Sequence, residues 1–312
     1  MEYIQLKNSD LTVSRFCMGG CPMGGYGWGA VQEDELIAAV HRALDHGVTF
    51  FDTADTYGLG QSERTLGKAL SARRKDVIIQ SKFGVKAGHG QTVYDNSPSY
   101  IRQALTDSLT RLNTEYIDLY TIHYRDYSTP IEEVVDTLRS LKQEGKIRYF
   151  GLSNIHEDTM AELLPYKGEF VTCQDEYSLA CRNHERDLRL LADELAVTPL
   201  TWGSLGQGIL TGKYTRENVT FGSDDRRSRD IYVNFHGAKL DQNLRIVDRL
   251  KTIAAAHGTS VPSCAIRFIL DYLPGSVVLA GVKRPAPLLS NLESFGWTLT
   301  PDEIALLNEV SQ

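Results

Sequence analysis

The chain has 312 residues, of which 42% are apolar and 23% are charged, values typical of a folded globular protein with a large core. Its formal net charge of −7 disfavours a broad surface for nucleic acid or acidic lipid, because both are polyanions. The sequence has neither a secretory signal pattern nor a run approaching about 18 apolar residues. We therefore expect a cytoplasmic protein that neither spans a membrane nor binds nucleic acid.

Five cysteines occur, an odd number, without a C-x-x-C pair or a neighbouring histidine cluster. This pattern favours reduced, buried thiols. His41 and His46 lie on a predicted helix and at its end, without partners at the spacing of metal ligands. They are typical of solvated or capping side chains, and the sequence predicts no metal site.

From the N-terminus, residues 3–6 and 11–13 alternate in hydrophobicity around a turn at residues 8–10, which predicts a β-hairpin. Strand-like and helix-like segments then alternate along the chain. The predicted strands are residues 15–18, 48–51, 77–81, 116–122, 147–152, 170–173, 198–202 and 276–280. The predicted helices are residues 33–46, 62–70, 99–112, 131–144, 156–164, 185–195, 240–257, 262–273, 287–294 and 301–310.

Each helix can return the chain across the sheet, which is what parallel strands require. The count favours an α/β fold, a single (β/α)8 TIM barrel over residues 1–312 with an N-terminal β-hairpin and extra C-terminal helices. Length agrees with one domain, since such barrels commonly occupy about 250 residues and accept insertions. A long polar segment at residues 213–237 is typical of a functional lid or a disordered insertion.

A glycine-rich run at residues 19–29 follows the first barrel strand. It contains no G-x-G-x-x-G between a strand and a helix, so it does not predict a Rossmann fold. We expect a loop over the barrel mouth. Its aromatic residues, Tyr26 and Trp28, could form an apolar wall for a substrate or could fold back as local packing.

Residues 48–58 read VTFFDTADTYG. Their β-branched and aromatic front half predicts a buried strand, and Asp52, Asp55 and Tyr57 follow it directly. In an eight-stranded α/β barrel the carboxyl ends of the strands open onto the active-site face. Titratable groups at this position are therefore candidates for chemistry.

The same stretch, with its flanking glycines, resembles the signature of the aldo-keto reductases, including bacterial members of the inositol-operon type and the potassium-channel β-subunit branch. This family reduces aldehydes and ketones with a nicotinamide cofactor in a (β/α)8 barrel. The resemblance implies a catalytic tetrad of Asp52, Tyr57, Lys82 and His123. It continues through residues 151–154, Gln174 and residues 281–291, so it covers nearly the whole chain.

In such a tetrad Tyr57 is the acid that protonates the developing alkoxide. The resemblance implies that Lys82 lowers the pKa of Tyr57 by stabilising phenolate, that Asp52 fixes Lys82, and that His123 donates to the carbonyl oxygen. The structural alternative is an Asp–Lys ion pair that closes a barrel layer, with Tyr57 and His123 as spectators. The family assigns no catalytic role to Asp55.

The resemblance also implies NADP(H) as cofactor, with NAD(H) as the alternative. Amide and hydroxyl groups suit a carboxamide, which offers one acceptor and two donors. By similarity, the nicotinamide would contact Ser153, Asn154, Gln174 and Trp202, and the diphosphate would contact Ser204, Leu205 and Lys213. The adenosine end would contact Gly281, Lys283, Arg284 and Asn291. Pro287 and Ser290 depart from the family pattern at this end, because neither supplies the expected side chain.

We expect NADPH-dependent reduction of a sugar, a polyol-derived carbonyl or another small aldehyde or ketone, with a substrate pocket of Tyr26, Trp28 and Tyr124. One alternative is a nucleotide-sugar ketone or enoyl reductase in a biosynthetic pathway, which would use the same tetrad. Another is a cofactor-binding regulatory protein, as the potassium-channel β-subunits of the family are. An intact tetrad disfavours the regulatory role.

Overall fold

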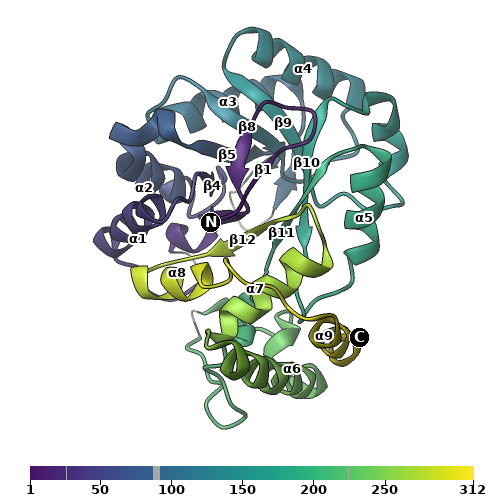
Figure 1. Cartoon of the computed structure of the whole chain (residues 1–312). Coiled ribbons are helices and arrows are strands. Elements are labelled where there is room, and N and C mark those ends of the chain that lie inside the picture. Colours follow the sequence, from purple (N-terminus) through teal and green to yellow (C-terminus); the bar gives the residue numbers. More distant parts are fainter. Residues whose placement is uncertain (26, 87–91, 224) are drawn as a thin grey trace.

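The computed structural model of the protein describes residues 1–25, 27–86, 92–223 and 225–312, and its centre is a closed barrel of parallel strands (Figure 1). The barrel strands are β3 (Phe16–Gly19), β4 (Phe50–Asp52), β5 (Ile78–Phe83), β8 (Ile117–Ile122), β9 (Ile147–Ser153), β10 (Phe170–Glu176), β11 (Thr198–Trp202) and β12 (Val277–Gly281). They neighbour one another in this order, and β12 pairs with β3 to close the ring. The predicted (β/α)8 barrel is confirmed.

Helices surround the barrel (Figure 1). They are α1 (Glu33–Asp45), α2 (Gln61–Leu70), α3 (Pro98–Leu112), α4 (Ile131–Gln143), α5 (Glu185–Glu194), α6 (Gly237–His257), α7 (Val261–Tyr272), α8 (Pro285–Leu292) and α9 (Pro301–Ser311). In α4, Val134, Leu138 and Leu141 recur at helical spacing and are buried, so one apolar stripe packs toward β9. Thr300 and Glu303 form the capping box that begins α9.

The N-terminal hairpin, β1 (Tyr3–Gln5) and β2 (Thr12–Ser14), is confirmed and lies across one end of the barrel (Figure 1). Its apolar side chains pack against those at the amino-terminal part of the barrel interior. This cluster comprises Leu6, Leu11, Val13, Cys17, Phe50, Leu119, Val171, Leu200, Val277 and Leu279. The hairpin therefore seals this end, and the strands' carboxyl ends form the open face.

One prediction about connections needs correction. The predicted helix over residues 156–164 is wrong, because the chain instead makes turns and a 3₁₀ segment, η3 (Met160–Tyr166). Pro165 lies inside this segment, and proline lacks the N–H that a continuing α-helix uses. In the segment predicted as a lid or an insertion, residues 213–237, Tyr214, Phe221 and Phe235 pack ring against ring.

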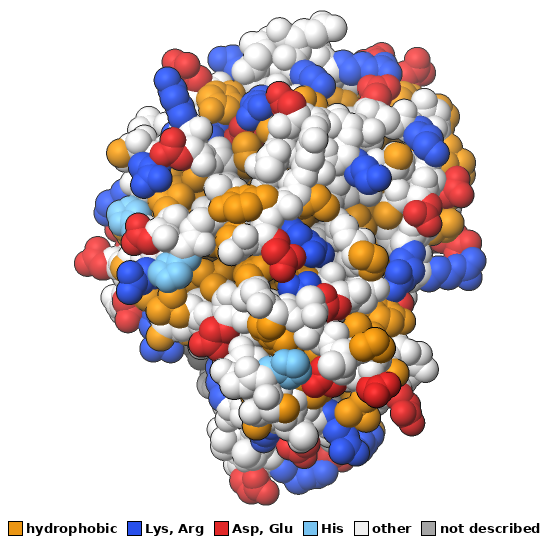
Figure 2. All heavy atoms as spheres, in the orientation of Figure 1, with side chains coloured by type: hydrophobic (Ala, Val, Ile, Leu, Met, Phe, Trp, Pro, Cys, Tyr) orange, Lys and Arg blue, Asp and Glu red, His pale blue; other side chains and the backbone are white. Residues whose placement is uncertain are grey.

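Acidic and basic side chains are interspersed on the face shown in Figure 2, with no broad patch of one sign. All five cysteines are free thiols, and three of them are buried. Over the described residues, no single helix has the length and apolarity to cross a membrane. Among these residues, only α6 and α7 taken together have this length and apolarity, and the two helices meet at a bend of 94°.

Candidate active site

Polar side chains gather inside the barrel near the carboxyl ends of β4 and β5. Asp52 ends β4 and pairs with Gln80 in the strand register. Since side chains two apart on a strand face the same side, Gln80 and Lys82 both lie beside Asp52, and all three are at most 1% exposed. Lys82 lies within β5 and not after it, because this strand extends two residues beyond its predicted end.

The ammonium group of Lys82 uses all three of its N–H donors within this cluster. It forms an ion pair with Oδ1 of Asp52, donates to the carbonyl of Thr53 at 2.9 Å, and donates to the hydroxyl oxygen of Tyr57 at 3.2 Å. Because the oxygen of Tyr57 accepts this bond, the phenolic hydrogen remains available to another acceptor. A residue that donates a proton to a substrate needs such an available hydrogen.

Tyr57 lies in the turn after β4, where two backbones approach closely. Gly58 has φ of +60°, and a Cβ on it would lie 2.2 Å from the carbonyl oxygen of Gly24. Only glycine fits there, and the turn is thereby held against the loop that follows β3. The ring of His123, which follows β8, lies edge-on to Tyr57 with centroids 5.9 Å apart. The structure thus brings the four predicted tetrad residues together.

Burial dominates the protonation of this cluster. It raises the pKa of Tyr57 well above its ordinary value, with the charge of Asp52 as the next cause, and it lowers the pKa of His123, helped by the charge of Lys82. The pKa of Tyr57 is therefore not lowered overall as predicted, because burial outweighs any stabilisation of phenolate by Lys82. At neutral pH both Tyr57 and His123 are uncharged and can donate a hydrogen bond.

Three polar residues proposed for the nicotinamide lie on the next strands of the ring. Ser153 ends β9, pairs with Gln174 in the register, and both are buried. Asn154 has φ of +54°, a conformation that asparagine tolerates. Its side-chain amide donates to the carbonyl of His123 at 3.0 Å and to the hydroxyl of Ser153 at 3.0 Å. This triplet therefore adjoins the tetrad directly.

The residues predicted to bind the diphosphate follow β11. Trp202, which was predicted to contact the nicotinamide, ends this strand and is half-buried, and so is Leu205 of the diphosphate set. The buried hydroxyl of Ser204 lies within hydrogen-bond distance of the carbonyls of Thr201 and Leu279, at 2.8 and 3.1 Å, and its single hydrogen is used there, so its side chain serves mainly the fold. Lys213 is exposed, and its ammonium lies 4.8 Å from the ring centroid of Tyr214.

The predicted adenosine-binding residues follow β12. Gly281 ends the strand, Arg284 precedes α8 and is exposed, and Asn291 is a buried residue of α8. Lys283 donates to the carbonyl of Trp28, and burial together with the nearby cation Arg227 lowers its pKa. The sequence prediction missed Arg227, because nothing in the sequence placed its long loop beside β12.

The predicted substrate residues lie around the barrel mouth. Trp28 is half-buried and packs edge-on against Tyr232, with centroids 5.9 Å apart. Tyr124 stacks on His123, with centroids 5.1 Å apart, and packs at a tilt of 31° against Tyr94, with centroids 5.2 Å apart. The prediction for Tyr26 falls on a residue outside the described ranges. Tyr94, on the short strand β7 (Val93–Tyr94), was missed, because its segment shows no periodicity that assigns it to the mouth.

Asp55 has an unusual environment although it belongs to no predicted tetrad. Its Oδ1 is buried and has no hydrogen-bond partner within the described ranges, and the ion pair between Glu63 and Arg111 lies nearby. Burial first, and then the charge of Glu63, raises the pKa of Asp55 to about 7.

Asp55→Asn should therefore change how stability depends on pH. The folded protein keeps the Asp55 proton between about pH 4 and 7 while the unfolded chain loses it, so this carboxyl destabilises the wild type as pH rises. Asparagine cannot ionise. Urea unfolding should show the stability of the variant relative to wild type improving by about 2–3 kcal/mol from pH 5 to pH 8, as a carboxyl pKa of about 7 in the folded state requires. Asp107→Asn, at an exposed acid of α3, is the control and should show no such change. If the free energy of unfolding of Asp55→Asn differed from wild type by the same amount at pH 5 and pH 8, the raised pKa of Asp55 would be contradicted.

A second group of titratable side chains lies beyond the ends of β9 and β10. His156 Nε2 is 3.1 Å from Asp175 Oδ2, and His184 Nδ1 is 3.2 Å from Asp187 Oδ2. The two imidazole rings stack face to face, with centroids 4.3 Å apart and planes 11° apart. Ring lone pairs lie in the ring plane, so stacked rings do not direct them at one ion. Each imidazole instead has its own carboxylate.

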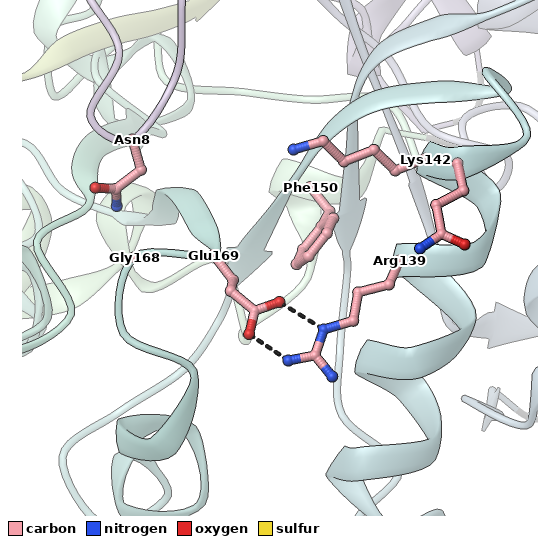
Figure 3. A pocket seen from close by; sticks show the side chains of 7 residues that line it. Asn8, Arg139, Lys142, Phe150, Gly168 and Glu169 are labelled. Carbon is pink, nitrogen blue, oxygen red and sulfur yellow. Dashed lines mark hydrogen bonds and ion pairs between the residues drawn. The ribbon is translucent and has the colours of Figure 1, made fainter.

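A surface cavity of about 360 Å³ lies at the sealed end of the barrel (Figure 3). Arg139 donates two hydrogen bonds to the carboxylate of Glu169 there, at 2.8 and 2.5 Å. These charges neutralise each other, and Asn8 of the hairpin turn forms the far wall. The cavity is at the opposite end of the strands from the tetrad, so it is not part of the candidate active site.

Comparison with known proteins finds relatives over nearly the whole chain. The profile of the Aldo/keto reductase family matches residues 15–312. Aldo-keto reductase YhdN of Bacillus subtilis (strain 168) is 35% identical, covering 99% of this chain and 93% of the relative. NADH-specific methylglyoxal reductase of Escherichia coli (strain K12) is 30% identical, covering 100% and 99%. The solved glycerol dehydrogenase AKR11B4 from Gluconobacter oxydans superposes with a TM-score of 0.89 at 33% identity, covering 99% and 94%.

The chain belongs to the aldo/keto reductase family. It is an oxidoreductase of the carbonyl-reducing class. The Escherichia coli relative is named for the nicotinamide cofactor NADH. The donor set fits such a cofactor. Oε1 of Gln174 accepts a hydrogen bond from Gln80, which leaves the Gln174 amide nitrogen to donate to a carboxamide.

Proposed function

We propose that this protein reduces an aldehyde or ketone to the alcohol with NADPH, and that Tyr57 delivers the proton. The observation that carries the proposal is the contact between the buried Lys82 ammonium and the Tyr57 hydroxyl oxygen, which leaves the phenolic hydrogen free. The neutral imidazole of His123, edge-on to Tyr57, is the second donor that can orient the carbonyl oxygen.

The cofactor supplies the hydride. Ser153, Asn154 and Gln174 would hold its carboxamide and so fix which face of the ring meets the substrate. The indole of Trp202 would stack under the ring. Backbone amides near Ser204 and Leu205, with Lys213, would hold the diphosphate, and the adenosine end would lie along Gly281, Lys283, Arg284 and Asn291.

Proton delivery rests on burial. The raised pKa keeps Tyr57 protonated until negative charge develops on the substrate oxygen. The Lys82 ammonium then stabilises the phenolate that forms, at a distance of 3.2 Å. Asp52 holds this ammonium in place through the ion pair. We also propose that residues 1–312 form one domain, which a core cluster with members from Phe16 to Leu307 supports.

We infer a small polar carbonyl as substrate, derived from a sugar or polyol. Tyr94 and Tyr124 form an aromatic wall beside His123, and Trp28 lies on another mouth loop. Relatives named for methylglyoxal and for glycerol support this size. The test is NADPH oxidation with methylglyoxal, glyceraldehyde, dihydroxyacetone and larger aldehydes. Tight NADPH binding without turnover of any carbonyl would instead indicate a regulatory binding protein.

We further propose that NADPH is preferred over NADH, because of Lys283 and Arg284. The two cofactors differ by one phosphate, so a preference requires cations placed at that group. Replacing both residues with Ser should weaken NADPH about ten- to a hundredfold and NADH little, as measured by fluorescence titration at fixed ionic strength.

The matched control for this double variant is Arg73→Ser with Lys75→Ser, which removes two exposed cations from the segment preceding β5. It changes the net charge equally and should leave both affinities unchanged. Equal losses for NADPH and NADH in the Lys283 and Arg284 variant would refute the assignment and would favour the NADH use for which the Escherichia coli relative is named.

A further inference from the structure

Gln80 is a buried side chain that contacts both halves of the proposed site. It lies in the middle of β5, opposite Asp52 in the register with β4 and opposite Leu119 in the register with β8. Its side chain is completely buried. We propose that Gln80 is a positioning residue, which orients Gln174 toward the nicotinamide and holds Asp52 for Lys82. This inference rests on the proposed function.

Both hydrogens of the Gln80 amide nitrogen are used. Nε2 donates to Oδ1 of Asp52 at 2.6 Å and to Oε1 of Gln174 at 2.5 Å. The identity of this nitrogen follows from chemistry, because an ionised carboxylate can only accept hydrogen bonds. One amide group thus links the strand that carries the proton-delivery residues to the strand that carries Gln174.

For Gln174, the bond from Gln80 decides which end faces the cofactor. Its oxygen is occupied by Gln80, so the amide nitrogen is the end available to a ligand, and it can only donate. The matching group on a nicotinamide carboxamide is the carbonyl oxygen. Gln80 therefore fixes one of the two orientations of Gln174, and with it the orientation of the carboxamide.

For Asp52, the bond from Gln80 supplies a second donor on the oxygen that already accepts from Lys82. Oδ2 of Asp52 has no partner in the described part of the chain, so these two donors account for its placement. Burial raises the pKa of Asp52, whereas Lys82 and Gln80 both lower it. Loss of Gln80 should thus make Asp52 easier to protonate, which would weaken its hold on Lys82.

A purely structural role does not account for glutamine at this position. Oε1 of Gln80 is buried and has no hydrogen-bond partner over the residues described. An unpaired buried carbonyl destabilises a fold, and methionine would fill a similar volume without this cost.

The test compares Gln80→Met with wild type in steady-state kinetics, in fluorescence titration with NADPH, and in thermal unfolding. We expect NADPH affinity to fall about tenfold, kcat to fall by at least as much, and the acidic limb of kcat to move to higher pH, with stability little changed. Thr172→Val is the control, since it removes a buried barrel hydroxyl that has no partner among the described residues.

Two further variants keep the inference testable if Gln80→Met folds poorly. In Gln80→Glu, a protonated side chain regains one O–H donor, so activity should recover partly as pH falls, which methionine cannot do. In a Gln174→Met background, a further change at Gln80 should cost no additional NADPH affinity. The proposal would be overturned if Gln80→Met kept the wild-type NADPH affinity, kcat and acidic limb. It would also be overturned if activity and affinity fell only in proportion to the fraction of the variant that is folded.

These outcomes separate the role of Gln80 from the proposed function. Failure of the wild type to reduce any carbonyl would reject the proposed function. The titration with NADPH would still decide whether Gln80 orients Gln174, because it measures binding without turnover. Normal turnover in Gln80→Met would reject the positioning role and leave the proposed function intact.

Discussion

Tyr57→Phe should lower carbonyl reduction by about 10²–10⁴-fold while NADPH binding stays near that of wild type. Phenylalanine keeps the ring and its packing against His123, but it removes the hydroxyl that accepts from Lys82 and donates to the substrate. Steady-state assays at saturating substrate, with a parallel fluorescence titration, measure the two quantities separately.

Tyr120→Phe is the matched control. Tyr120 is a fully buried tyrosine of β8 whose hydroxyl has no partner in the described residues, so removing it should leave turnover unchanged. If Tyr57→Phe retained wild-type turnover, another residue would have to deliver the proton and the proposed chemistry would fail. A loss of NADPH binding as large as the loss of turnover would also contradict a role confined to proton delivery.

Lys82→Met should abolish most activity and also destabilise the fold, by about 3–5 kcal/mol. Both members of the Lys82–Asp52 pair are buried, so removal of the ammonium leaves a carboxylate without its charge partner. Any residual alcohol oxidation should have its alkaline limb at higher pH, because the positive charge beside Tyr57 is gone. Urea unfolding and a pH–rate profile measure the two effects.

The double variant Lys82→Met with Asp52→Asn distinguishes charge balance from catalysis. Removing both charges should restore part of the stability but none of the activity, because the lost stability comes from an unpaired charge and the lost activity from the absent ammonium. Recovery of activity in the double variant would show that Lys82 serves only the ion pair. That result would favour the alternative in which the pair closes a barrel layer and Tyr57 is a spectator.

The sequence was most informative where a local pattern determines the structure. Apolar runs of strand length, helical spacing and turn residues predicted the barrel, the hairpin and the capping box at Thr300. The sequence also allowed us to predict that the tetrad residues lie close together, because they lie near strand ends and the carboxyl ends of parallel strands meet at one face. The apolar spacing of residues 156–164 was misleading, since they form turns and part of a 3₁₀ segment, and Pro165 prevents an α-helix from continuing through this segment.

Interactions that depend on closure of the ring were not predictable. The contacts of Gln80 with Asp52 and Gln174 require the register of several strands, which one sequence does not give. The direction in which the pKa of Tyr57 shifts depends on the balance between burial and the paired charges of Asp52 and Lys82. The place of Tyr94 against Tyr124 likewise follows from the path of a short strand outside the barrel.

Closure of the ring between β3 and β12 also constrains when this protein can fold during synthesis. Phe16 of β3 pairs with Val278 of β12, so the first barrel strand lacks one neighbour until nearly the whole chain has been translated. At a translation rate of roughly 5–20 residues per second, that edge of β3 stays unpaired for some tens of seconds while the chain is on the ribosome. Glu2 is likewise translated long before Arg267, its ion-pair partner on α7. An open strand edge invites pairing with other chains, so the nascent barrel is the stage at which this protein is most exposed to aggregation and to capture by chaperones.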